Sequence, residues 1–384
     1  MSKISYKNKV EGCLYISSFL DTFGFFNSKW EFNYGNKIDT IKDGVIMNYF
    51  FIHQYTMLGG IEQIDITNLN ASDDTILMLA TCEAVNNGGG ESNYINSYLK
   101  YYEELKNEKR QAGNTTLSSL EKIRLTKSIK SIEYSNNHGG NGCAIRTAPI
   151  GLKYWNDYDK VCEEALIASL VTHNYPLGYL GGIVAALFTA YAVNNINPFE
   201  WSKKLIKLYK KKYFNKLISK YSEQNVEKEI TDYFIWWEKY NELRLSKMKY
   251  RNLPIFINPN YKIQDLTNYT PIKYLTKMKG YDKMGGSGLE AVILAYDNLL
   301  LSAKSNNNVN PLVNNVNPLV NIVNPEFDWY TLFFNNVFFF GDNDSIGAIS
   351  GAWYGAYLGI DKFPLDKIKN LEFYQELKKN AKLF

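Results

Sequence analysis

The sequence predicts an all-α protein. Apolar residues recur at helical spacing in many segments, whereas convincing alternating strands are scarce. The helical segments are 14–26, 75–85, 98–105, 161–171, 180–193, 289–300 and 345–358. The best strand candidate, Leu332 to Phe340, fits a buried helix equally well. With 384 residues, of which 45% are hydrophobic, the chain can build a sizeable core. We predict one domain over residues 1–384.

Composition excludes several classes of protein. The net charge of +4 is too small to indicate a nucleic-acid partner, and no run interleaves basic and aromatic residues. The four cysteines are far apart and form no C-x-x-C pair, which indicates reduced thiols in a cytoplasmic protein. The polar segment Met1 to Glu11 lacks the features of a signal peptide. Because only three histidines exist, a bound metal is expected to be a hard cation held by oxygen.

One uncharged segment is nearly long enough to span a membrane. Residues Asn174 to Phe199 carry no charge, and a spanning helix needs ~20 apolar residues. Gly178, Gly181 and Gly182 interrupt the run, and asparagines follow it directly. We predict a buried core helix and no membrane partner.

Two polar regions are expected to lie at the surface. Residues 305–325 repeat Asn-Pro-Leu-Val, and Pro311, Pro318 and Pro325 forbid a continuous helix, so we predict an Asn/Pro-rich loop insertion. The charges between Lys203 and Arg251 are expected on solvent-exposed helix faces, with the tryptophans of this region as packing residues.

The first informative motif is Ser72-Asp73-Asp74-Thr75, which directly precedes an apolar helical segment. A serine or aspartate at this place is typical of a helix N-cap. A capping cluster is therefore one interpretation. Two adjacent carboxylates exceed what a cap requires, because like charges repel unless a proton or a cation neutralises them.

The second motif is Gly341-Asp342-Asn343-Asp344-Ser345, again before an apolar helical segment. Gly347, Gly351, Gly355 and Gly359 follow at every fourth residue, so they share one helix face and allow another backbone to come close. Together the two motifs offer oxygen ligands for one or two divalent cations such as Mg²⁺. Spacing alone does not show whether they meet.

Several motifs in order resemble one known family. They are Leu20-Asp21-Thr22-Phe23-Gly24, Asn27 to Phe32 (with Lys29-Trp30-Glu31-Phe32), Ser72 to Thr75, Gly140 to Arg146, Thr172 to Pro176, Leu187 to Val193, Gly285 to Gly288, Ala295 to Asp297, and Asp342 to Ser345. From about Val10 to Tyr374 the chain resembles the ADP-ribosylglycohydrolases, and it is most similar to their ADP-ribosylarginine hydrolase branch.

The resemblance implies a compact orthogonal helical bundle with two Mg²⁺ ions. It implies hydrolysis of the bond between ADP-ribose and protein arginine, with ADP-ribosylated proteins as substrates, ADP-ribose as product and a monomeric enzyme. Asp73 or Asp74 would accept a proton from water. The implied metal ligands are Ser72, Asp73, Asp74, Asp342, Asp344 and Ser345. The implied substrate-binding residues are Glu31, Gly140, Asn141, Gly142, Cys143, Arg146, Gly285, Gly286, Ser287 and Gly288.

Some assignments stay open at this point. Glu31 could instead form a surface ion pair, Arg146 a structural ion pair, and His173 a structural hydrogen bond; the role of His138 is open. Leu20, Phe340, Met284 and Lys283 depart from the family pattern. Met284 and Phe340 motivate the alternatives of an ADP-ribosylserine, poly(ADP-ribose) or O-acetyl-ADP-ribose hydrolase; a non-catalytic ADP-ribose-binding relative is a further alternative.

Overall fold

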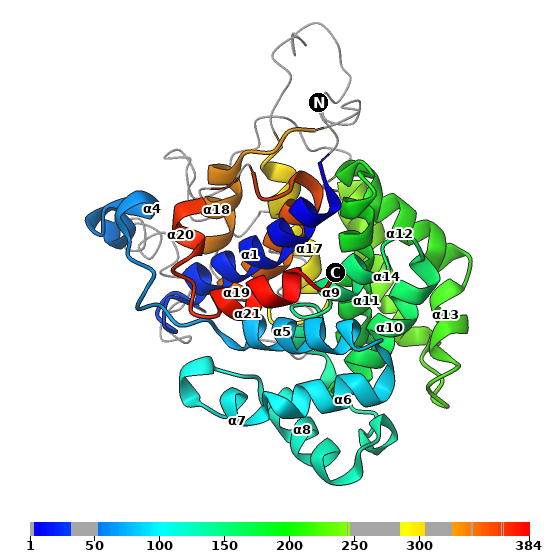
Figure 1. The fold of residues 1–384 in the computed structure, drawn as a ribbon. Coiled ribbons are helices and arrows are strands. Elements are labelled where there is room, and N and C mark those ends of the chain that lie inside the picture. The colour runs from blue at the N-terminus through cyan, green and yellow to red at the C-terminus, as the bar shows by residue number, and fades with distance from the viewer. Residues whose placement is uncertain are drawn as a thin grey trace, which may run out of the picture.

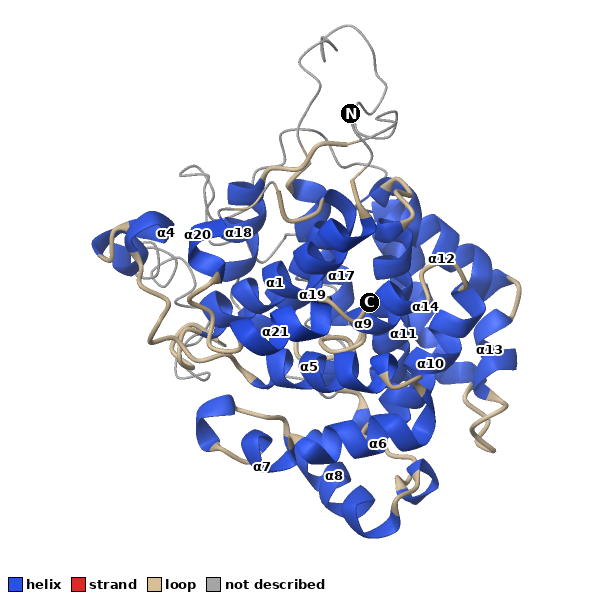
Figure 2. Cartoon of the chain, in the orientation of Figure 1, coloured by secondary structure: helices blue, strands red, loops and turns tan. Residues whose placement is uncertain are grey.

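The computed structural model describes residues 4–31, 53–243, 245, 285–303, 325–338, 341–361, 363 and 365–384. Within these ranges the protein is all-α, as predicted, and the only β-type pairings are two isolated bridges (Figures 1 and 2). Phe32, Lys283, Met284, Phe340 and the Asn/Pro-rich insertion up to Asn324 lie outside the described residues. The prediction of a single domain stays a prediction.

Two helices from opposite ends of the chain form the centre of the fold. Helix α1 (Tyr6–Phe25) begins at Ser5, whose side chain accepts a hydrogen bond from the Asn8 backbone, and packs against α19 (Asn343–Leu358). Glycines allow this contact: a Cβ on Gly355 would lie 2.1 Å from the Gly12 backbone. The predicted close approach along this face is thereby confirmed for Gly347, Gly351 and Gly355. Gly359 instead follows the last helical residue.

The uncharged segment forms α11 (Pro176–Val193), and 94% of this helix is buried inside the protein. It packs against α10 (Tyr158–Leu170), α9 (Ala148–Lys153), α19 and α14 (Glu227–Leu243). By length and composition it is the one helix among the described residues that could cross a membrane. Its surroundings are those of a core helix.

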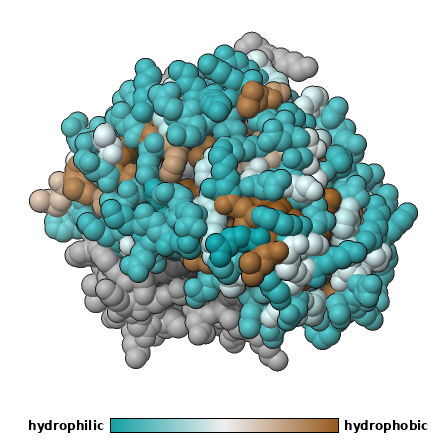
Figure 3. Space-filling model, turned by 60° about the horizontal axis from the view of Figure 1, so that its bottom comes forward, coloured by the Kyte–Doolittle hydropathy of each residue, from teal (hydrophilic) through white to brown (hydrophobic). Residues whose placement is uncertain are grey.

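The other helices surround this centre. Helices α6 (Gly90–Lys100), α7 (Tyr102–Leu105) and α8 (Asn114–Thr126) lie at the bottom of Figure 1. The face that Figure 3 brings forward is mostly hydrophilic, with small hydrophobic patches. The remaining elements are α4 (Gly60–Gln63), α5 (Asp73–Asn86), α12 (Trp201–Lys210), α13 (Tyr213–Ile218), α17 (Glu290–Leu301), α18 (Trp329–Val337), α20 (Leu365–Ile368), α21 (Tyr374–Ala381), and the short 3₁₀ helices η1 (Glu108–Arg110), η2 (Ile129–Ser131), η3 (Asn136–His138), η4 (Asn141–Cys143) and η5 (Pro198–Glu200).

Of the strand candidate Leu332 to Phe340, residues 332–337 are helical, so the buried-helix interpretation is correct there, and residues 339–340 lie outside the described residues. Residues Trp329–Val337 form α18, which begins at Asp328, whose carboxylate accepts from the Thr331 N–H at 2.8 Å. The aromatic residues that gave this segment its strand-like composition instead pack against one another, as Phe333 and Phe338 do with Tyr55. In the lysine-rich region, Trp201 and Trp237 are buried, as expected for packing residues.

Candidate metal and substrate site

Asp21 links the first helix to the first acidic motif. Its carboxylate is fully buried in α1 and accepts hydrogen bonds from the Ser72 hydroxyl at 2.6 Å, from the Thr75 N–H at 3.2 Å and from the Thr75 hydroxyl. Burial raises the pKa of Asp21 to about 6, and the hydrogen bonds from Ser72 and Thr75 limit the rise. These bonds hold the end of α1 against the start of α5.

The first acidic motif caps α5, but it contains more carboxylates than a helix cap requires. Ser72 is the N-cap, and its side chain accepts from the Asp74 N–H at 3.1 Å. Asp74 is buried, and its Oδ2 has no hydrogen-bond partner among the described residues. Asp73 keeps part of its surface exposed. Because an unpartnered buried carboxylate oxygen is costly, a role beyond capping is indicated.

The second acidic motif begins α19. The Asn343 side chain donates to the backbone carbonyls of Trp30 at 3.0 Å and Val337 at 3.1 Å, which fixes the turn. Asp342 and Asp344 are 5% and 3% exposed. They are therefore almost as inaccessible as core residues although they are acidic.

The two acidic motifs meet in space. Carboxylate oxygens of Asp21, Asp74 and Asp344 lie within 4.8 Å of one another, and those of Glu31, Asp342 and Asp344 do the same. Asp344 belongs to both groups, so the carboxylates form one continuous acidic cluster. Oxygen-only ligands at this spacing suit a hard divalent cation.

Electrostatics indicate that this cluster needs a counter-charge. Burial raises the pKa of Asp74 well above its usual range, and the carboxylates of Asp73, Asp21 and Asp342 add to the rise. Burial likewise raises the pKa of Asp344, with further contributions from Glu31, Asp342 and Asp74. A bound cation would stabilise the ionised forms that burial and mutual repulsion now disfavour.

Glu31 reaches the cluster because the preceding residue is fixed. The Trp30 ring stacks on Phe26 with ring centroids 3.9 Å apart, and its indole N–H donates to Gln54 Oε1 at 2.9 Å. The structure thus places half-buried Glu31 beside Asp342 and Asp344.

Two glycine-rich loops lie against the cluster. Gly140 and Ser287 form an antiparallel bridge, and the Asn141 N–H donates to the Gly286 carbonyl at 3.1 Å. The Asn141 side chain donates to the Gly285 carbonyl at 3.1 Å and to Asp342 Oδ2 at 2.9 Å. Asn141 therefore connects both loops to the acidic cluster.

Close packing explains part of the glycine content. A Cβ on Gly181 would lie 2.3 Å from the Gly288 carbonyl oxygen, and a Cβ on Gly178 would lie 2.4 Å from that of His138. The loops thereby rest directly on the first turns of α11. Gly142 and Gly286 lie in the same pair of loops.

Behind the first loop, the predicted residues Cys143 and Arg146 are fully buried. Arg146 donates to the Ala168 carbonyl at 3.0 Å and to Thr172 Oγ1 at 2.7 Å, and its guanidinium lies 4.7 Å from the Tyr98 ring centroid. No carboxylate of a described residue pairs with it within 4.0 Å. Arg146 thus lies in the scaffold behind the loop and makes no structural ion pair with a described residue.

The histidines support the same loop. The Thr172 hydroxyl lies 2.7 Å from His173 Nδ1, and a Cβ on Gly142 would come within 3.0 Å of the His173 ring. Burial, with Arg146 and His138 nearby, lowers the pKa of His173 well below its usual range, which favours the neutral ring. His138 accepts from the Asn174 N–H at 3.4 Å.

Sequence reasoning assigned no site role to Asp21 or Glu290. Asp21 is the one charged residue in the buried stretch 12–25 of α1, where an isolated carboxylate is a signal in itself. Glu290 is fully buried three residues after Ser287, the S-x-x-E spacing of a capping box. Leu20, by contrast, packs in the α1–α19 contact against Gly347, so this departure from the family pattern does not line the cluster.

Comparisons with known proteins point to one family. The family model for ADP-ribosylglycohydrolases matches residues 2–384. The chain is 32% identical over 371 residues to an ADP-ribosyl glycohydrolase candidate, L444, of Acanthamoeba polyphaga mimivirus; the match covers 91% of this chain and spans 64% of that relative's length. It is 27% identical over 400 residues to ADP-ribosylhydrolase ARH1 of Dictyostelium discoideum, covering 96% of this chain and 91% of that protein.

A solved structure, an ADP-ribosylglycohydrolase-related protein complex, shares the fold. Its TM-score is 0.55 at 15% identity, with 98% of this chain and 97% of that chain covered. The family is one of metal-dependent glycosyl hydrolases that act on ADP-ribosylated substrates, and the clustered carboxylates described above could bind a metal. With the whole chain matched by the family model, the protein is a member of the ADP-ribosylglycohydrolase family.

Proposed function

We propose that the protein is a magnesium-dependent hydrolase that cleaves the N-glycosidic bond between ADP-ribose and protein arginine and releases ADP-ribose. The observation that carries the proposal is the contact of Asn141 with both Gly285 and Asp342. This contact joins the glycine-rich loops, which suit a diphosphate, to the acidic cluster. The likeness to ADP-ribosylhydrolase ARH1 and the sequence Lys29-Trp30-Glu31 support the arginine linkage. We further propose a monomeric cytoplasmic enzyme, in keeping with its four free, buried cysteines.

The residues of the cluster fit Mg²⁺. Asp74 offers a buried, unpartnered oxygen, and Asp344 lies within 4.8 Å of four other carboxylates. Asp342 and the hydroxyls of Ser72 and Ser345 complete a set made only of oxygen, with Asp73 next to them. When bound, Mg²⁺ would supply a Lewis acid that orients the ribose hydroxyls and lowers the pKa of a water.

The chain's own residues then account for the remaining chemistry. As the bond from C1″ to the guanidinium nitrogen breaks, positive charge develops at C1″, and nearby carboxylates stabilise it. Water adds its oxygen to C1″ and gives one proton to a carboxylate, and the leaving guanidine nitrogen takes up a proton. Asp73 suits the acceptor role, because part of the residue stays exposed to water and a bound cation would keep its carboxylate ionised.

The loops would hold the other end of the substrate. Backbone N–H groups at Gly140, Gly142 and Gly286 can approach a diphosphate closely because no Cβ intervenes at the glycines, whereas those of Asn141 and Gly288 already pair with the opposite loop. Cys143 and Arg146 support the loop from behind. Glu31, beside Asp342 and Asp344, would contact the ribose or the guanidinium.

The test compares substrates and one pair of variants. Peptides ADP-ribosylated on arginine or on serine are incubated with the protein in Mg²⁺ or in EDTA, and released ADP-ribose is measured. We expect release from arginine only with Mg²⁺, and Asp344→Asn to lower it about 100-fold or more. Asp232→Asn, at an exposed ion pair with Lys228, is the matched control and should retain activity.

Three outcomes would contradict the proposal. Equal release of ADP-ribose in EDTA would show that the reaction does not need a metal. Preferential release from serine would favour the serine-hydrolase alternative. Binding of ADP-ribose with no release from either peptide would favour a non-catalytic reader, although Asp73, Asp74, Asp342 and Asp344, which a hydrolase needs, are all present.

A further inference from the structure

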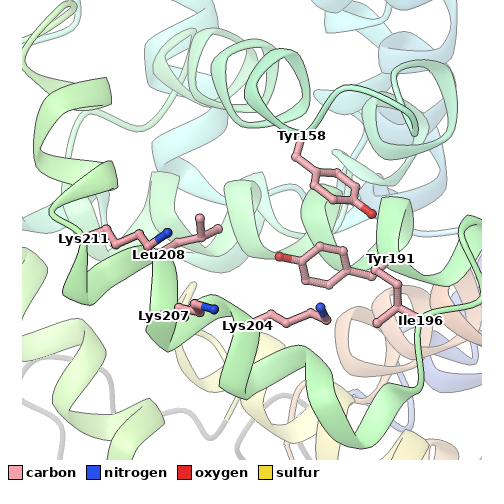
Figure 4. A pocket seen from close by; sticks show the side chains of 7 residues that line it. All are labelled: Tyr158, Tyr191, Ile196, Lys204, Lys207, Leu208 and Lys211. Carbon is pink, nitrogen blue, oxygen red and sulfur yellow. The ribbon is translucent and has the colours of Figure 1, made fainter.

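A cavity separate from the acidic cluster lies beside α12. Its volume is about 170 Å³, and Figure 4 shows the residues around it. Helix α12 and the residue after it contribute Lys204, Lys207, Leu208 and Lys211. The opposite wall consists of Tyr158, at the start of α10, and Tyr191 and Ile196, at and beyond the last turn of α11.

The cavity is remote from the acidic cluster. The first turns of α11 support the glycine-rich loops, whereas its last turn borders this cavity. Gly178 and Gly181 lie 13 and 10 residues before Tyr191, so the helix separates the two places by roughly 15–20 Å at 1.5 Å per residue. None of the lining residues belongs to the proposed catalytic machinery.

Three lysines gather at this cavity without partners. Lys204, Lys207 and Lys211 follow one another at i, i+3 and i+7, which places them on one helix face. No described carboxylate lies within 4.0 Å of any of them. Like charges at this spacing repel weakly, and an anion bound between them would turn that repulsion into attraction.

The neighbouring lysines of the same segment, by contrast, do have partners. Three of them form ion pairs of 2.6–3.2 Å, namely Lys203 with Glu200, Lys210 with Glu238 and Lys212 with Glu227. Ion pairing is thus the rule on the other faces of the same segment. The lysines that face the cavity are the ones left for another anion.

The wall opposite the lysines is aromatic. The rings of Tyr158 and Tyr191 meet edge to face, with centroids 5.1 Å apart and an interplanar angle of 88°. Tyr191 is only 3% exposed, and it lines the cavity. A cavity of ~150 Å³ lined by apolar side chains accommodates a benzene ring, so this one is large enough for one six-membered ring.

We propose that this cavity binds a small phosphomonoester of an aromatic or heteroaromatic alcohol. The ring would lie among Tyr158, Tyr191 and Leu208, and the phosphate would accept charge-assisted hydrogen bonds from the lysines at the rim. The Tyr191 hydroxyl can donate to the ester or phosphate oxygen.

The test uses phenyl phosphate as the probe. Calorimetry measures its binding to the whole protein at physiological ionic strength, with and without saturating ADP-ribose. Inorganic phosphate and phenol are separate arms and should each bind more weakly than phenyl phosphate. The triple variant Lys204→Ala/Lys207→Ala/Lys211→Ala should weaken binding about tenfold or more, because charge-assisted bonds are lost.

The matched control removes the same charge from the same segment. Lys203→Ala/Lys210→Ala/Lys212→Ala should bind phenyl phosphate as the wild type does. Because all six lysines are exposed, both triple variants should keep the wild-type melting temperature. Tyr191→Phe, which keeps the ring, should give a smaller loss.

The proposal fails if no saturable binding occurs at millimolar phenyl phosphate. An equal loss of phenyl phosphate affinity in both triple variants would show only a general attraction to the basic surface, and would also overturn the proposal. Competition by ADP-ribose would place the probe in the catalytic site instead. Equal binding of phenol would show an apolar cavity without an anion site.

Discussion

Glu290 illustrates how a buried carboxyl can couple the substrate loop to pH. Its backbone N–H donates to the Ser287 hydroxyl at 3.1 Å, and its side chain is fully buried at the first turn of α17. Burial raises the pKa of Glu290 to about 8, although backbone N–H groups of Gly285 and Ser287 limit the rise. The folded protein therefore holds a proton that the unfolded chain releases near pH 4.3.

This difference predicts a pH-dependent gain for Glu290→Gln. Below pH ~4.3 both states of the wild type are protonated. As pH rises from there to about 8, the unfolded state ionises first, so the free energy of unfolding falls. Gln has nearly the same size and carries no charge at any of these pH values. Measured by urea unfolding in excess Mg²⁺, the free energy of unfolding of the variant should exceed that of the wild type at pH 8 and equal it near pH 4. The same pH dependence in both proteins would contradict this prediction.

At the scale of elements, the contact between α1 and α19 sets the position of Asp344. A Cβ on Gly24 would lie 2.6 Å from the backbone of Asn343 and Asp344. At the other end of the contact, a Cβ on Gly355 would lie 2.1 Å from the Gly12 backbone. Since the neighbouring atoms are backbone, they cannot rotate away. The glycines thus bring the start of α19 next to Asp21.

Substituting alanine for Gly24 or Gly355 should distinguish effects on stability from effects on metal binding. Ala is favoured over Gly within a helix by about 1 kcal/mol, but overpacking costs about 1–3 kcal/mol or more. We expect Gly24→Ala and Gly355→Ala both to lower the free energy of unfolding, measured in urea. Only Gly24→Ala should also weaken Mg²⁺ binding by calorimetry, because it displaces Asp344.

Gly113→Ala is the control for this pair, because no atom lies within 4 Å of the added Cβ and φ is −61°. It should change stability by less than about 1 kcal/mol. Equal Mg²⁺ affinity in the Gly24 and Gly355 variants would disprove the positional argument.

At the scale of the whole molecule, one ion pair joins distant segments behind the site. Arg110 donates two hydrogen bonds of 2.8 Å to Glu372, just before α21, and one of 2.9 Å to the Ala71 carbonyl. The Ala71 N–H in turn donates to Glu372 at 2.9 Å. The pair therefore holds both backbone groups of the residue that precedes Ser72. A bidentate, largely buried pair of this kind contributes more than an exposed one.

A double-mutant cycle measures this contribution. Arg110→Met and Glu372→Gln should each lower the free energy of unfolding by about 1–3 kcal/mol, with a coupling energy of about 0.5–3 kcal/mol. The cycle Lys228→Ala with Asp232→Asn, at an exposed pair, is the control and should give at most about 0.5 kcal/mol. Additive effects of the Arg110 and Glu372 changes would refute the coupling.

The sequence by itself determined most of what is local. Helical periodicity predicted the segments that became α5, α11, α17 and α19, because a helix depends on neighbours three and four residues apart. It also located the Ser72 cap and the acids beside it, and the ordered motifs indicated the family. For residues 332–337 both states fitted the sequence, since a short, mostly apolar run suits a buried strand as well as a buried helix, and only its packing decided for a helix.

Tertiary structure decided which of these residues share a site. Asp21, Glu31 and Asn141 join the acidic cluster through contacts between segments far apart in the chain. No periodicity encodes such contacts, because they depend on how helices pack, here on glycines that admit a neighbouring backbone. Arg146 is a second example: a motif suggested it as a substrate residue, but the fold places it in the core behind the loop. The three unpaired lysines are a third, because the cavity that they share exists only once α11 and α12 are assembled.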